Sequence, residues 1–188
     1  MEKKCVLFSG GHESTILLHY LLKKFKDCEI YPVYIKFGFD YESVEILKAM
    51  EIIASVKNKR IKQVEVVEAK LPLVLRENKI PLRNALLFSL VGTFMYENEI
   101  KEVYHGNLGA SGYPDNTMDY FDLMEKVIST GMERDFKIIQ PFYQKNKKDI
   151  YNEFKKEILQ TDFFSCIQPV NGKACGRCLK CQEKKSLN

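Results

Sequence analysis

Short apolar runs alternate along the chain with longer segments whose apolar residues recur at helical spacing. The apolar runs lie at residues 3–8, 30–37, 63–68, 102–105 and 136–140. The helix-patterned segments lie at residues 16–25, 43–57, 84–96, 116–128 and 147–159. Runs of this length predict strands, and strands joined by helices pair in parallel. The alternation therefore predicts an α/β fold with a doubly wound, mainly parallel five-stranded sheet that binds ligands at the carboxyl ends of its strands.

Length and charge limit the domain organisation and the class of partner. The 188 residues suffice for one ordinary domain, and four crowded cysteines mark residues 166–188 as a tail packed on an α/β domain of residues 1–165. A net charge of +4 favours anionic ligands without requiring nucleic acid. No apolar stretch reaches the ~20 residues that span a bilayer, and the first residues lack a signal-peptide pattern. We therefore expect a cytoplasmic protein with no membrane partner and no direct nucleic-acid partner.

The turn after the first predicted strand has the composition of an anion-binding loop. It reads Ser9-Gly10-Gly11-His12-Glu13-Ser14-Thr15 and leads into the first predicted helix. Glycines let the backbone wrap an anion, hydroxyls donate to phosphate oxygens, and a helix N-terminus adds partial positive charge. The pattern is neither the dinucleotide-binding G-x-G-x-x-G nor the Walker G-x-x-x-x-G-K-[ST]. The loop therefore predicts phosphate binding outside those two nucleotide-binding classes.

The C-terminal tail carries four cysteines at metal-ligand spacing. Cys166 precedes Cys175 by nine residues, and Cys175, Cys178 and Cys181 follow one another with two residues between each pair. Four thiolates can close a tetrahedral zinc site that leaves no open position, so its role would be structural. An iron–sulfur cluster is the alternative, because the same spacing occurs in ferredoxin-type sites.

These two motifs resemble those of a known enzyme family. The loop resembles the S-G-G-x-D-S loop of the ATP-pyrophosphatase (PP-loop) superfamily, with Glu13 in place of the usual Asp. Together with the tail, it resembles the 7-cyano-7-deazaguanine synthase family, whose members end in S-C-x₈-C-G-x-C-x-x-C. The chain is also similar to that family in the segments Pro81-Leu82-Arg83-Asn84 and Ser111-Gly112-Tyr113-Pro114-Asp115, and in Lys147 at a helix start.

The resemblance implies an adenine nucleotide hydrolase-like fold and an ATP-dependent carbon–nitrogen ligase of queuosine or archaeosine biosynthesis. Such an enzyme converts 7-carboxy-7-deazaguanine and ammonia to 7-cyano-7-deazaguanine, through an adenylated carboxylate and an amide. The implied cofactors are ATP, Mg²⁺ and Zn²⁺, and the implied assembly is a homodimer. The implied roles are ATP binding by Ser9, Gly10, Gly11, Glu13, Ser14 and Thr15; catalysis by Arg83, Lys147 and Asp115; substrate binding by Asn84, Ser111, Tyr113 and Asp115; and metal binding by Cys166, Cys175, Cys178 and Cys181.

Departures from the family pattern keep two alternatives open. Gly109 stands where the family commonly has Asp, Asn116 stands where it has Cys, and residues 39–42 lack its Gln-Arg-His cluster. A PP-loop paralogue that adenylates a different carboxylate or nucleobase, for amidation or thiolation, is one alternative. A zinc-ribbon RNA-binding module is the other, favoured by tail cations at Lys173, Arg177, Lys180, Lys184 and Lys185.

Overall fold

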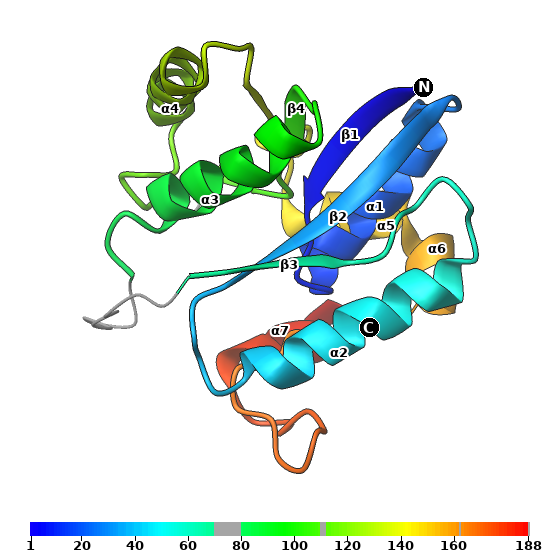
Figure 1. The fold of residues 1–188 in the computed structure, drawn as a ribbon. Helices are drawn as coiled ribbons and strands as arrows, with labels where there is room; N and C mark the ends of the chain where they lie inside the picture. The colour runs from blue at the N-terminus through cyan, green and yellow to red at the C-terminus, as the bar shows by residue number, and fades with distance from the viewer. Residues whose placement is uncertain (70–79, 110–111, 162, 188) are drawn as a thin grey trace.

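The computed structural model describes residues 1–69, 80–109, 112–161 and 163–187 (Figure 1). Its sheet has five parallel strands in the order β3-β2-β1-β4-β5. The strands are β1 (Glu2–Leu7), β2 (Cys28–Lys36), β3 (Glu65–Glu68), β4 (Glu102–Tyr104) and β5 (Lys137–Ile139). This confirms the predicted α/β class and the doubly wound parallel sheet, because the order reverses on either side of β1.

Seven helices are formed by the described residues, and six of them cover the two faces of the sheet. They are α1 (His12–Lys24), α2 (Glu42–Val56), α3 (Arg83–Glu97), α4 (Met118–Met132), α5 (Lys147–Glu153), α6 (Lys155–Gln160) and α7 (Leu179–Leu187). Figure 1 shows α3 and α4 on the opposite side of the sheet from α1, α2, α5 and α6. None of the described helices is long and apolar enough to cross a membrane.

The alternation of side chains along β1 explains why both faces carry a core. Val6, and Phe8 directly after the strand, enter the core that includes α1, α2, α5 and α6, whereas Cys5 and Leu7 enter the core that includes α3 and α4. All of these except Leu7 are at most 1% exposed, and Leu7 is 8% exposed. Successive residues of a strand point to opposite faces, so a continuously apolar strand is buried on both.

Two elements differ from the sequence-based prediction. The helix predicted at residues 147–159 is divided at Phe154, whose φ of −113° and ψ of 18° leave the helical region. Phe154 is 2% exposed and packs edge-on against Phe142, so burial of its ring outweighs helix continuity. Helix α7 was not predicted, because Leu179–Leu187 contains few apolar residues to give a helical pattern.

Candidate nucleotide site and metal centre

The loop between β1 and α1 forms a tight cradle at the carboxyl edge of the sheet. Gly10 has a φ of +72°, and a Cβ there would lie 3.1 Å from the Ala49 Cα of α2. The Gly11 N–H donates to Ser9 Oγ at 3.3 Å, and Ser14 Oγ donates to the Gly11 carbonyl at 3.1 Å. Only glycine combines this conformation with this close approach, so the local sequence fixes the turn.

The start of α1 offers groups that fit a phosphate. In the described part of the chain, no side chain caps this helix, so its first N–H groups keep their anion-binding character. Thr15 is fully buried, and its Oγ1 has no hydrogen-bond partner among the described residues. The glycine cradle, the helix terminus and the loop hydroxyls together make a donor set suited to the phosphates of ATP.

His12 occupies the variable position of the loop and turns into the core rather than toward the cradle. Its ring stacks on Tyr151 with centroids 5.5 Å apart and meets Phe163 edge-on at 5.0 Å. Burial lowers the pKa of His12 to about 4, an effect that the nearby Glu13 carboxylate partly opposes. His12 is therefore neutral at physiological pH and anchors the loop by its ring.

Glu13 and Lys147 form an ion pair that extends to the C-terminal helix. Lys147 Nζ lies 2.9 Å from Glu13 Oε1 and 2.8 Å from Oε2 of Glu183. Burial raises the pKa of Glu13, but the charge of Lys147 and its hydrogen bond outweigh burial, so this pKa falls below its ordinary value. Glu13 is thus an anionic oxygen ligand of the kind Mg²⁺ prefers. Sequence reasoning missed Glu183, because only the fold brings α7 to Lys147.

Asn84 and Asp115 are joined at the start of α3. The Asn84 backbone N–H donates to Asp115 Oδ2 at 3.1 Å, and Asn84 Nδ2 donates to the Asp115 carbonyl at 2.7 Å. Tyr113, in the same loop as Asp115, is 44% exposed. Ser111, predicted to bind substrate, lies outside the described residues. The structure therefore brings Asn84 and Asp115 together and gives Asp115 the additional role of capping α3.

Arg83 is exposed at the first position of α3. Burial lowers the pKa of His105, at the end of β4, to about 4, and the charge of Arg83 lowers it further. Burial raises the pKa of Glu45 to about 7, while Arg83 acts in the opposite direction. An exposed guanidinium near these groups is available to an anionic ligand.

Glu42 is a site-forming residue that sequence reasoning missed. Its carboxylate accepts hydrogen bonds from the backbone N–H groups of Phe37, Gly38 and Phe39, at 2.7 to 3.1 Å. Glu42 is 2% exposed and closes the loop after β2, where the family's Gln-Arg-His cluster is absent. An acidic residue at a helix start, four residues after a glycine, is the sequence signal that could have identified it.

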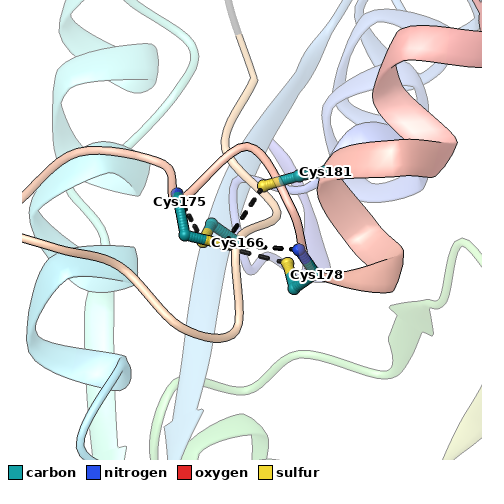
Figure 2. Close-up of side chains that lie close together, drawn as sticks. All are labelled: Cys166, Cys175, Cys178 and Cys181. Atoms are coloured by element: carbon teal, nitrogen blue, oxygen red, sulfur yellow. Dashed lines mark hydrogen bonds between the residues drawn. The ribbon is translucent and has the colours of Figure 1, made fainter.

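The four tail cysteines converge to a single cluster (Figure 2). The four sulfurs lie within 4.8 Å of one another, with Cys175 and Cys181 at 4.0 Å and Cys166 and Cys178 at 3.9 Å. Hydrogen bonds from the backbone N–H groups of Arg177 and Cys178 lower the pKa of Cys175 to about 6. Burial raises the pKa of Cys181 to about 12, so the fit of the cluster to a metal ion rests on the convergence of four sulfur ligands.

The cysteine cluster contacts both helix α2 and the phosphate loop. Val44 of α2 packs against the buried Phe164 and the cysteines. The Phe164 N–H donates to the carbonyl of Gly10 at 2.9 Å. The predicted metal centre therefore adjoins the predicted phosphate loop, although more than 150 residues separate Gly10 from Cys166 in the sequence.

The chain matches the model of one protein family and is similar in fold to solved structures. The family model described as queuosine biosynthesis protein QueC matches residues 43–187. The chain is similar in structure to the tRNA thiolase NcsA from Methanococcus maripaludis, solved with its 4Fe–4S cluster, at a TM-score of 0.63 and 13% identity. The match covers 98% of this chain but only 64% of the thiolase.

A second solved structure, a predicted subunit of tRNA methyltransferase from Methanocaldococcus jannaschii, is similar at a TM-score of 0.50 and 15% identity. That match covers 91% of this chain and 81% of the other. At such identities the two structures bear on the fold alone, and they agree with the parallel sheet described above.

Proposed function

Because the chain belongs to the QueC family of queuosine biosynthesis proteins, we propose that it converts 7-carboxy-7-deazaguanine and ammonia to 7-cyano-7-deazaguanine at the expense of ATP. The observation that carries this proposal is the loop of residues 9–15. Its glycine cradle, its uncapped helix start and the Glu13–Lys147 pair form one site for a magnesium-bound triphosphate.

The proposed reaction follows from the poor reactivity of a carboxylate. Transfer of AMP from ATP to one carboxylate oxygen releases pyrophosphate and makes that oxygen a leaving group. Ammonia then attacks the carbonyl carbon, AMP departs with the oxygen, and an amide forms. A second ATP then transfers AMP to the amide oxygen and releases pyrophosphate, and departure of AMP with that oxygen and loss of two protons from nitrogen give the nitrile. This scheme needs no covalent protein nucleophile.

The proposed roles of the side chains follow their positions. Ser9, Ser14 and Thr15 would donate to phosphate oxygens with the loop amides, and Glu13 would hold Mg²⁺, which neutralises phosphate charge. Lys147 and Arg83 would stabilise charge on the transferred phosphate and on the carboxylate. Asn84, Ser111, Tyr113 and Asp115 would bind the deazaguanine, with Asp115 placed by its hydrogen bonds to Asn84.

We propose zinc rather than an iron–sulfur cluster for the four cysteines. Zinc–sulfur bonds of about 2.3 Å in a tetrahedron place the sulfurs about 3.8 Å apart, and two pairs here lie at 3.9 and 4.0 Å. In a cluster of four irons each thiolate binds a different iron, so its sulfurs must be farther apart. Metal analysis and visible absorption distinguish the two, because zinc sites are colourless. The homodimer and the cytoplasmic location stay predictions.

A paralogous activity is the second candidate, and Gly109 favours it. A Cβ at Gly109 would lie 2.7 Å from the Tyr143 carbonyl, so the Asp that the family commonly has here does not fit this loop. The substrate-facing loop is therefore shaped differently, as another carboxylate or nucleobase would require. The RNA-binding alternative is weaker, because Lys180 pairs with Glu183, and Lys184 and Lys185 donate to the carbonyls of Phe163 and Gly176.

The test is to identify the products by mass spectrometry. Zinc-loaded protein is incubated with ATP, magnesium, ammonium and 7-carboxy-7-deazaguanine, and a parallel reaction omits ammonium. The proposal predicts nitrile and AMP only when ammonium is present. Neither amide nor nitrile from protein that binds ATP would contradict it and favour the paralogue.

A further inference from the structure

Helix α7 connects the cysteine cluster to the predicted catalytic lysine. Cys181 lies within α7, Cys178 directly precedes it, and Glu183 follows Cys181 by two residues. Glu183 Oε2 lies 2.8 Å from Lys147 Nζ and 3.2 Å from Lys180 Nζ. A metal ion bound by the four thiolates would fix the start of α7, and with it the position of Glu183.

The segment that enters the cluster from its N-terminal side, just before Cys166, also contacts the phosphate loop. Phe164, two residues before Cys166, donates its N–H to the carbonyl of Gly10 at 2.9 Å. Lys184 of α7 donates to the carbonyl of Phe163 at 2.6 Å, and the Phe163 ring contacts His12. Both segments that enter the cluster therefore contact the loop or the lysine beside it.

Lys147 is held by two carboxylates whose surroundings differ. Glu13 belongs to the phosphate loop, and Glu183 belongs to the helix anchored by the cysteines. If Glu13 held Mg²⁺ beside a bound triphosphate, its carboxylate would be shared with the ion, and its hold on Lys147 would weaken. Glu183 would then keep the ammonium group at the edge of the loop, where it can reach the phosphates.

We infer that the four-cysteine knuckle braces the nucleotide site, and that Glu183 is the positioning residue through which it holds Lys147. This inference rests on the proposed function, since it assumes that ATP occupies the loop of residues 9–15. A brace of this kind links the two ligands: a bound metal strengthens ATP binding, and bound ATP strengthens metal binding by the same coupling free energy.

Three variants of the metal-loaded full chain test the inference. Glu183→Gln removes the charge that holds Lys147, and Glu183→Asp keeps it. Glu153→Gln is the matched control, because Glu153 also pairs with a lysine, Lys145, at 2.5 Å. For each protein, the dissociation constant of ATP with Mg²⁺ and the metal content per chain are measured. A salt concentration of ~0.3 M screens the general effect of removing a negative charge.

The inference predicts that Glu183→Gln weakens ATP binding about five-fold or more while its metal content equals that of the wild type. Glu183→Asp retains most of the affinity, and Glu153→Gln binds as the wild type does. Unchanged affinity in Glu183→Gln, or weakened affinity that accompanies loss of metal, would overturn the positioning role. A wild-type protein that fails to bind ATP would instead refute the proposed function.

The linkage itself has a separate readout. Release of the metal to a coloured chelator is followed with and without saturating ATP and Mg²⁺. We expect ATP to slow release in the wild-type protein and to slow it less in Glu183→Gln. Equal release rates with and without ATP, from protein shown to bind ATP, would overturn the bracing role of the knuckle.

Discussion

The phosphate loop (residues 9–15) and the cysteine knuckle (residues 166–181) adjoin one another but are organised in opposite ways. The loop presents backbone N–H groups at an uncapped helix start, and Thr15 Oγ1 has no partner among the described residues. The knuckle directs four sulfurs at one another within 4.8 Å. Donors left without partners at a helix start suit a ligand that binds and leaves, whereas a closed set of four ligands suits a resident ion.

The difference shows how one small domain can combine turnover with rigidity. A loop that releases its nucleotide after each reaction must keep its conformation through contacts with the protein and not through the nucleotide. Here the knuckle is tied to it through the Phe164–Gly10 hydrogen bond and the Lys147 ion pairs. Loss of a knuckle thiolate should therefore lower both stability and metal content, whereas changes in the loop should leave the metal content unchanged.

The largest expected effect comes from opening the knuckle. Cys178→Ser removes one of four ligands at a position that is 8% exposed. We expect the metal content to fall close to zero and the free energy of unfolding to fall by about 4 kcal/mol or more. Metal analysis and denaturant unfolding measure both. Cys28→Ala, a buried thiol far from the knuckle, serves as the control and should keep its metal; full metal content in Cys178→Ser would contradict the ligand assignment.

The loop is tested by a matched pair of glycines. Gly10 and Gly112 both have positive φ values, of +72° and +67°. Among the described residues, a Cβ at Gly10 would lie 3.1 Å from the Ala49 Cα, whereas a Cβ at Gly112 would meet nothing within 4 Å. Gly10→Ala should lower the free energy of unfolding by about 3 kcal/mol and Gly112→Ala by about 1 kcal/mol, because only the first substitution adds a steric clash to the backbone strain. Unfolding measurements give both numbers. Equal costs would show that the close approach to α2 does not constrain the loop.

A substitution at Lys147 tests whether the loop and the knuckle have separate functions. Lys147→Met should lower the rate of ATP-dependent product formation about 100-fold, because a cation that stabilises transferred charge is lost. Metal content should be unchanged. Lys145→Met is the control, since Lys145 pairs only with Glu153 among the ion pairs of the described residues. A variant that keeps full activity, or one that loses its metal, would refute the assignment of Lys147 to the nucleotide site.

The smallest effect concerns the anchor of the loop, His12. Its folded pKa of about 4 lies below the unfolded value, so the unfolded chain binds more protons as pH falls from about 6.5 to 4. The stability contributed by neutral His12 is therefore present above this window and lost within it. His12→Phe keeps a ring against Tyr151 and Phe163. When the pH falls from 7 to 5, its free energy of unfolding should decrease by about 2 kcal/mol less than that of the wild-type protein. The same pH dependence in both proteins would show that His12 is not held neutral.

The fold was largely predictable because its signals are local. Continuous apolar strands such as residues 3–8 and helical apolar patterns such as residues 43–57 are properties of short segments. The division at Phe154 was not predictable, because the Phe154 ring packs edge-on against Phe142, and the helical apolar pattern carries no information about that contact. Helix α7 lacks an apolar pattern and is organised around Cys178 and Cys181 instead.

The candidate site was predictable only where a motif carries it. The glycines of the loop and the spacing of the cysteines identify both centres. The contacts between them were not predictable, since Phe164, Lys147 and Glu183 reach the loop only through the tertiary fold. Asp115 was predicted to bind substrate, and its bond to the Asn84 N–H shows that a residue can cap a helix at the place where a ligand is expected.

The most direct test of the central claim, that the loop binds ATP for transfer of AMP to a carboxylate, follows one oxygen atom. The substrate 7-carboxy-7-deazaguanine is prepared with a heavy oxygen isotope in its carboxylate and incubated with the metal-loaded protein, ATP, magnesium and ammonium. The account predicts that the released AMP carries heavy oxygen, because AMP departs with the substrate oxygen. AMP without the label, formed alongside the amide or nitrile, would contradict it.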